Sequence, residues 1–294
     1  MFVYDVEKLK AEFSTVLGEN VTADAWNWLL EKSEAIRKGD VLQLNTAFAA
    51  TPRKTGKNLV RLSVEQEGKI RNIRKNLSIR HWSVDRLCRV WLLLHLNPAD
   101  KDAYVRTIES LFRNAEMNEL LALYSSLPVL AYPEAWKQRC AEGIRNNIGS
   151  VLESVICNNP YPSENLDEAA WNQLVLKAFF TEKPVHEIIG LDERANQTLA
   201  NTLSDYAHER WAAHRTIHPQ LWRCVGKFIN PQLFPDIERI AYSENSVERE
   251  AALLACSQSK FKPALDLLKR NPELKFLIEA REITWNTLAE KTIN

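Results

Sequence analysis

Helical periodicity along almost the whole chain is the feature that most limits what these 294 residues can fold into. Apolar residues recur every three or four positions, and the strict alternation of a half-buried strand is hard to find over a strand length. The chain also has only eight glycines, whereas tight turns and phosphate-binding loops depend on that residue. The sequence therefore predicts an all-α protein.

The periodicity predicts helices over 4–17, 22–37, 40–50, 63–76, 83–96, 98–113, 116–126, 133–157, 166–181, 192–215, 218–229, 232–243, 246–258, 261–270 and 273–290. Two segments near the C-terminus, 247–255 and 261–268, resemble the paired antiparallel helices of a HEAT unit. We therefore expect a multi-helix array with HEAT/armadillo-like stacking of helical hairpins.

The chain is expected to form a single all-α domain over 1–294. Within it, a basic linker over 51–62 would separate an N-terminal sub-domain, 1–50, from the main helical array, 63–294. The linker is predicted because this segment is polar and is interrupted by Pro52 and Gly56, which break regular structure.

Charge excludes a strong global attraction to polyanions. Lysine plus arginine and aspartate plus glutamate both number 38, so the formal net charge is zero, and we expect no nucleic-acid partner. The segment 53–89 is an exception, because its Lys and Arg residues greatly outnumber its acids. This segment is either a solvated face or a site for an anionic partner such as a phosphorylated metabolite, a membrane surface or RNA.

Cysteine use and apolar runs predict a cytoplasmic protein. The five cysteines are widely spaced, form no CxxC pair and lie in apolar helical pattern, so we expect reduced core residues. The N-terminus lacks the pattern of a signal peptide. The longest apolar run, 90–94, is too short to span a bilayer, which leaves at most peripheral contact with a membrane.

Several polar residues fall on helical faces that are otherwise apolar. Arg210 and His214 lie one turn apart on the apolar stripe of the predicted helix 192–215, and His208 lies on the opposite side. A buried arginine is costly unless it is paired. Asp167, at the first turn of the helix 166–181, is a candidate partner for Arg210.

Two asparagines and a tryptophan are also predicted to face inward. Asn147 lies in the middle of the apolar stripe of the helix 133–157, and Asn158 continues that line at the start of the segment Asn-Asn-Pro-Tyr-Pro. Gly143, at the edge of the stripe, would let a neighbouring helix approach closely. Trp171 is predicted to be buried. A buried amide needs a hydrogen-bond partner, from protein or from a ligand.

Three interpretations of these residues stay open: a structural polar network, a ligand-binding cavity and a catalytic site. The cavity would be lined by residues that share an inward position: Asn147, Asn158, Asp167, Trp171, Arg210 and His214. No metal site is predicted, because His208 and His214 are six residues apart, whereas a zincin helix needs histidines four apart. No cofactor and no catalytic residue is assigned, which favours a binding protein over an enzyme.

Five segments of the middle third resemble the EboA family. They are AEGIRNN at 141–147, NNPYP at 158–162, DEAAWNQLVLKA at 167–178, GLDERAN at 190–196 and YAHERWAA at 206–213. The resemblance is close over about ninety residues and loose over the flanks.

The resemblance implies a role in metabolite traffic. The family is associated with bacterial gene clusters that move a secondary-metabolite precursor from the cytoplasm toward the periplasm. It implies partners among the other products of the cluster, including a membrane protein and metal-dependent enzymes, and it supplies no catalytic residues. We expect a protein that binds the metabolite or a cluster partner. The alternatives are a non-catalytic α-solenoid scaffold and an enzyme with an α-helical cavity.

Overall fold

The structure, a computed structural model, describes residues 1–292. Helices make up 69% of the chain and no strand is present in the described part, which confirms the all-α prediction. None of the helices described there has the length and apolar composition needed to span a bilayer. The chain forms two compact units, residues 1–167 and 168–294, which we call the first and second units. The division into sub-domain, linker and array stays a prediction.

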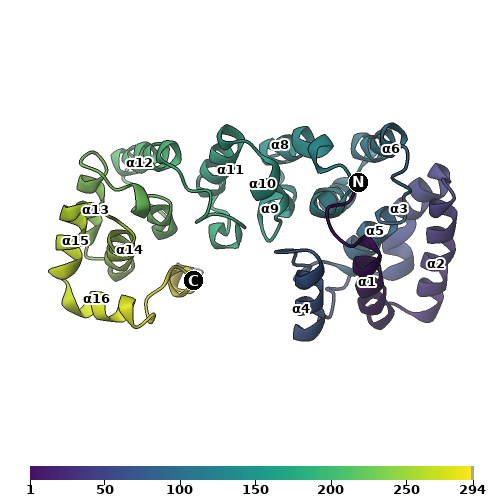
Figure 1. The fold of residues 1–294 in the computed structure, drawn as a ribbon, viewed down its shortest axis with the longest axis horizontal. Helices are drawn as coiled ribbons and strands as arrows, with labels where there is room; N and C mark the ends of the chain where they lie inside the picture. The colour runs from purple at the N-terminus through teal and green to yellow at the C-terminus, as the bar shows by residue number, and fades with distance from the viewer. Residues whose placement is uncertain (293–294) are drawn as a thin grey trace. The chain divides into compact units, whose positions relative to one another are not determined.

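The first unit holds ten α-helices and two short 3-10 turns (Figure 1). The helices are α1 (Val6–Asn20), α2 (Ala23–Arg37), α3 (Val41–Thr55), α4 (Val64–Ile73), α5 (Val84–Leu93), α6 (Lys101–Asn114), α7 (Met117–Ser126), α8 (Lys137–Arg145), α9 (Gly149–Ile156) and α10 (Tyr161–Asn165). The turns are Leu127–Val129 and Pro133–Trp136. The N-terminal segment lies against the 3-10 turn Leu127–Val129, where the Tyr4 hydroxyl donates a hydrogen bond to the Val129 carbonyl over 2.7 Å.

Helix α5 is the centre of the first unit, because it packs against α1, α2, α3 and α7. Nine of its ten residues are buried, as expected of a helix that is enclosed on all sides. Its charge pair, Arg89 with Asp85, lies within the helix, and the Nη2 atom of Arg89 has no hydrogen-bond partner in the described part of the chain. Arg89, which is fully buried, donates to Asp85 over 2.6 Å and to the Phe48 carbonyl over 2.9 Å.

The predicted continuous helix 133–157 is wrong, because a three-residue break separates α8 from α9. Asn146 leaves the helical conformation, and its side-chain oxygen accepts a hydrogen bond from the Ile148 amide over 2.8 Å. Such local side-chain bonds compete with the helical ladder. Asn147 lies in the break and is exposed, so its predicted inward position is also wrong.

Gly143 does allow the close approach that the sequence predicted. A Cβ atom at this position would lie 2.6 Å from both Tyr124 Cε1 and Val155 Cγ2. Helix α8 therefore packs against α7 and α9 at a distance that only glycine permits.

The second unit contains α11 (Glu168–Phe180), α12 (Gln197–Ala212), α13 (Phe234–Ala241), α14 (Ser246–Ser257), α15 (Lys262–Lys269), α16 (Pro272–Glu279) and α17 (Trp285–Thr292). Helix α14 is central, and α13, α15, α16 and α17 surround it (Figure 1). Its apolar run, 251–256, is buried. The two helices predicted near the C-terminus are confirmed as α14 and α15.

Two other helix predictions in this unit are corrected. The segment 218–229 holds two 3-10 turns, Pro219–Arg223 and Gly226–Phe228, in place of one α-helix. Helix α12 ends at Ala212, so His214 lies beyond the helix and is exposed. The predicted inward position of His214 is therefore wrong.

Candidate functional site

The Asn-Asn-Pro-Tyr-Pro segment forms a connector in the first unit whose polar groups are used by the protein. Asn159 is buried and donates to the carbonyls of Tyr124 and Ser154 over 3.1 and 3.0 Å. Its side-chain oxygen accepts from the Tyr161 amide over 3.0 Å, and the Tyr161 hydroxyl donates to the Pro133 carbonyl. These bonds fix the turn between α9 and α10.

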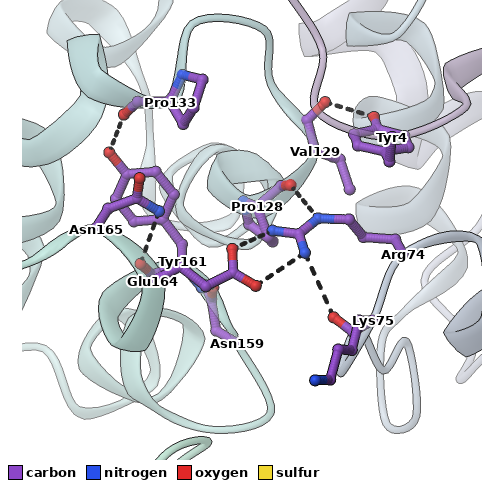
Figure 2. Close-up of polar contacts among 10 residues, drawn as sticks. All are labelled: Tyr4, Arg74, Lys75, Pro128, Val129, Pro133, Asn159, Tyr161, Glu164 and Asn165. Atoms are coloured by element: carbon purple, nitrogen blue, oxygen red, sulfur yellow. Dashed lines mark hydrogen bonds and ion pairs between the residues drawn. The ribbon is translucent and has the colours of Figure 1, made fainter.

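Figure 2 shows the ion pair that anchors the same connector to α4. Arg74, whose side chain is 8% exposed, forms a bidentate pair with Glu164 of α10. Its Nε atom donates to the Pro128 carbonyl over 2.8 Å. These bonds hold three segments of the first unit together. They use most of the N–H donors of the guanidinium, so few remain for a ligand.

Ion pairs account for much of the basic segment 53–89. Five of its cations, Lys69, Arg71, Arg74, Arg80 and Arg89, pair with carboxylates. Glu67 serves two of them, and its hydrogen bond from Arg80 lowers the pKa of its carboxyl group. These pairs neutralise five of the cations and so weaken the interpretation of the segment as an anion-binding surface. Arg74 and Arg89 are buried, so they do not belong to a solvated face either.

The second unit contains a pocket of about 670 Å³ that we call the Arg210 pocket. Four separated parts of the unit line it: the end of α11 and the turn after it, α12, the loop 216–219, and the neighbouring ends of α14 and α17. Its walls mix apolar side chains such as Phe179 and Ile217 with a few polar groups, which is the usual composition of a small-molecule site.

Arg210 is one of five charged residues that line this pocket, with Glu182, Lys183, Glu248 and Lys291. Its Nε atom donates to the Thr216 carbonyl over 2.9 Å, and the nearest carboxylate, Glu182, lies 3.8 Å away with its side chain 77% exposed. Of the five N–H donors of a guanidinium, only one therefore has an acceptor within hydrogen-bond distance in the described part of the chain. Arg210 is itself 20% exposed, so its remaining donors are accessible from the pocket.

Two histidines add directional donors and acceptors. The Nδ1 atom of His218 accepts a hydrogen bond from the Gln220 amide over 3.2 Å, so the Nε2 atom of the neutral ring carries the proton. Burial lowers the pKa of His218, and His186 lowers it further. His218 is therefore a neutral donor near pH 7. Lys291 contributes little free charge, because it bonds to both oxygens of Glu250.

A second, smaller pocket of about 340 Å³ adjoins the first and shares Thr216 and Glu248 with it. We call it the Arg239 pocket. Its other lining residues include Trp211, His214, Arg215 and Arg239. The two pockets are thus neighbours, and both are lined in part by the loop that follows α12.

The predicted site residues fall into two groups. Asn147, Asn158 and Asp167 belong to the first unit, and Trp171, Arg210 and His214 belong to the second. Arg210 lines the larger pocket and His214 the smaller one. Trp171 is fully buried in α11, as predicted. The pairing of Arg210 with Asp167 stays a prediction.

Sequence reasoning missed Glu182, His186, His218 and Arg239. Each lies in a separate turn or helix, so no helical stripe links them to Arg210. The one available signal was a proline close to each of two histidines, His186 and His218. A proline indicates a turn, but it does not indicate that two such turns lie next to each other in the fold.

Ser204, Asp236 and His208 form a polar cluster between α12 and α13 that does not have the geometry of a catalytic triad. His208 Nε2 lies 2.7 Å from one oxygen of Asp236, and the Ser204 hydroxyl donates to the other. The carboxylate therefore separates the hydroxyl from the imidazole, whereas nucleophile activation needs direct contact between them. This cluster ties the two helices together.

Comparison with known proteins gives one result. A family model described as metabolite traffic protein EboA matches residues 9–226. No curated protein and no solved structure matches the chain at a significant level.

Proposed function

The chain belongs to the EboA family of metabolite traffic proteins, and on that premise we propose that its second unit binds a small amphipathic anion in the Arg210 pocket. The ligand would be a metabolite in transit that carries a carboxylate or an ionised hydroxyl. The observation that carries the proposal is the guanidinium of Arg210, which borders a pocket and, among the described residues, has no carboxylate within hydrogen-bond distance.

Electrostatics supports an anionic ligand. A charged group that is mostly removed from water is costly unless an opposite charge compensates it. Glu182 compensates Arg210 weakly, because the two groups are 3.8 Å apart and Glu182 is largely solvated. A carboxylate would meet the planar N–H fork of Arg210 with two parallel hydrogen bonds.

The remaining walls support an apolar body on the ligand. Phe179, Ile217 and Pro219 line the pocket, and the Phe179 ring lies 6.1 Å from the His218 ring. A neutral His218 can donate from Nε2 to a carbonyl or hydroxyl of the ligand without attracting a second anion. A volume of about 670 Å³ suits a molecule of drug-like size.

The test is native mass spectrometry of the protein purified with the products of its gene cluster present. We expect the wild type to carry a bound small molecule and Arg210→Gln to lose it. Arg106→Gln is the matched control, because Arg106 is an exposed arginine of α6 in the first unit and lines neither pocket. An Arg210→Gln protein that keeps the same bound mass would refute the proposal.

The proposal includes the finer expectations drawn from the resemblance. The protein would act in the cytoplasm, assist export of a secondary-metabolite precursor and meet other products of its cluster. Its paired helices α14 and α15 would stack in the HEAT/armadillo manner. Fractionation of cells that express a tagged protein tests the location directly.

The alternative is a non-catalytic scaffold for cluster proteins, and one observation favours it. Helix α16 has no buried residue, and Phe276 on that helix is 66% exposed. A scaffold would use such a surface and not the pocket. Capture of cluster partners should then survive Arg210→Gln and fail with Phe276→Ser.

A further inference from the structure

We propose that the Arg239 pocket is a second, separate binding site, and that it takes the phosphate group of a small soluble phosphate monoester. Two guanidiniums and one imidazole, from Arg239, Arg215 and His214, line this hollow of about 340 Å³. The inference does not rest on the function proposed above, because none of these three groups lines the Arg210 pocket.

The charges around this pocket are not compensated by protein. In the described part of the chain, neither Arg215 nor Arg239 has a carboxylate within 4.0 Å. One acid, Glu248, lines the pocket and pairs with neither arginine. The two guanidiniums therefore outweigh the single carboxylate, and a dianion would gain from both of them.

Arg239 is held in place before any ligand arrives. Its guanidinium carbon lies 4.1 Å from the centre of the Trp211 ring. Trp211 stacks in turn on Trp222 at 5.9 Å with an interplanar angle of 22°, and Trp222 is almost completely buried. Stacking uses the flat face of the guanidinium and leaves its N–H edge free to donate. A donor that is already ordered loses less entropy when it binds.

The end of α12 places the other two groups. The Arg215 amide donates to the Arg210 carbonyl and the His214 amide donates to the Trp211 carbonyl, over 2.9 and 3.0 Å. This is a Schellman motif with His214 in the left-handed position, at a φ of 54°. Glycine is usual there because it avoids the steric cost. A glycine, however, would give the pocket no side chain.

We assign the site to a soluble phosphate and not to a membrane headgroup. The side chains of His214, Arg215 and Arg239 are exposed, and they line a hollow between the loop 214–216 and the helices α13 and α14. A small hollow suits one compact phosphate group, and its exposed donors are within reach of a soluble monoester. A phosphate can accept several N–H donors at once, which a carboxylate with two oxygens does less well.

The experiment is isothermal titration calorimetry of the full chain with glycerol 3-phosphate at fixed ionic strength, with acetate as the comparison anion. We expect saturable binding of glycerol 3-phosphate and much weaker binding of acetate. Arg239→Gln should weaken binding at least about tenfold, the loss typical of a charge-assisted pair. Glu248→Gln should strengthen it, because the competing negative charge is removed. Arg106→Gln and Arg210→Gln should leave it unchanged.

His214→Gly keeps the test independent of folding. The substitution relieves the left-handed strain, so the melting temperature should stay equal or rise while the affinity for glycerol 3-phosphate falls. Equal affinity in Arg239→Gln and wild type would overturn the proposal. So would binding only to phosphatidylcholine vesicles that contain phosphatidic acid, with none to the soluble probe. Loss of binding in Arg210→Gln with Arg239→Gln unaffected would place the phosphate in the larger pocket and also overturn it.

Discussion

Replacement of Gly143 by alanine should destabilise the first unit, because the added methyl group has no space. Its Cβ would lie 2.6 Å from Tyr124 Cε1 and Val155 Cγ2, and both side chains are almost completely buried. Overpacking of this kind costs roughly 1–3 kcal/mol, and two rigid neighbours place the cost near the upper end. Alanine recovers about 1 kcal/mol of helix propensity, which leaves a net loss of about 2 kcal/mol.

The matched control is Gly68→Ala in the interior of α4. No atom lies within 4 Å of a Cβ built at Gly68, so only the helix propensity changes. This substitution should raise the free energy of unfolding by roughly 0.5–1 kcal/mol. The two glycine-to-alanine changes should therefore have opposite signs within the same unit.

The assay is urea denaturation followed by far-ultraviolet circular dichroism, with calorimetry for the melting temperature. A loss of about 2 kcal/mol in a unit of this size lowers the melting temperature by about 4–8 °C. Val155→Ala in the Gly143→Ala background should recover part of the loss, seen as a coupling energy in a double-mutant cycle. A Gly143→Ala protein as stable as Gly68→Ala would refute the packing argument.

Three further predictions follow from buried groups. Glu164→Ala should lower the free energy of unfolding by about 2 kcal/mol, measured in urea, because it leaves Arg74 with its positive charge unpaired; the partial exposure of Glu164 reduces the cost. Burial lowers the pKa of His95 to about 4; the unfolded chain, with a pKa near about 6.5, therefore binds the proton first. Stability should fall as the pH drops from about 6.5 to 4, by up to about 1.4 kcal/mol per pH unit, and His95→Gln should flatten this slope in denaturation curves. Four cysteines are buried and Cys157 is half-buried, and burial raises the pKa of Cys88, Cys224 and Cys256 to about 12; Ellman's reagent should label at most one thiol of the native protein, and rapid labelling of two or more would contradict the structure.

The sequence pattern correctly predicted features that depend only on residues close together along the chain. The sequence predicts a helix over 22–37, and the structure has α2 there, with the Thr22 hydroxyl accepting a hydrogen bond from the Ala25 amide over 3.3 Å. Trp171 was assigned to a buried face and is buried. Both follow from helical geometry within one or two turns, which the sequence expresses directly.

The same reasoning failed where a short-range polar bond interrupted a helix. The stripe that placed Asn147 inward assumed an unbroken helix, and the Asn146 side chain ends it. His214 was predicted to face inward because the predicted helix, 192–215, ran three residues past the end of α12 at Ala212. Helix ends depend on the balance between side-chain bonds and the backbone ladder, and periodicity is insensitive to that balance.

By itself, the sequence determined an all-helical protein with mostly buried cysteines, a close helix approach at Gly143 and membership of one family. Only the tertiary structure decided what Arg210 faces. Its pocket is assembled from parts of the chain as distant as Phe179 and Lys291, and the neighbouring Arg239 pocket joins α13 to the end of α12. The reason is physical: a helical stripe records which side of a helix is buried, whereas the identity of the groups that meet there depends on how separate helices pack.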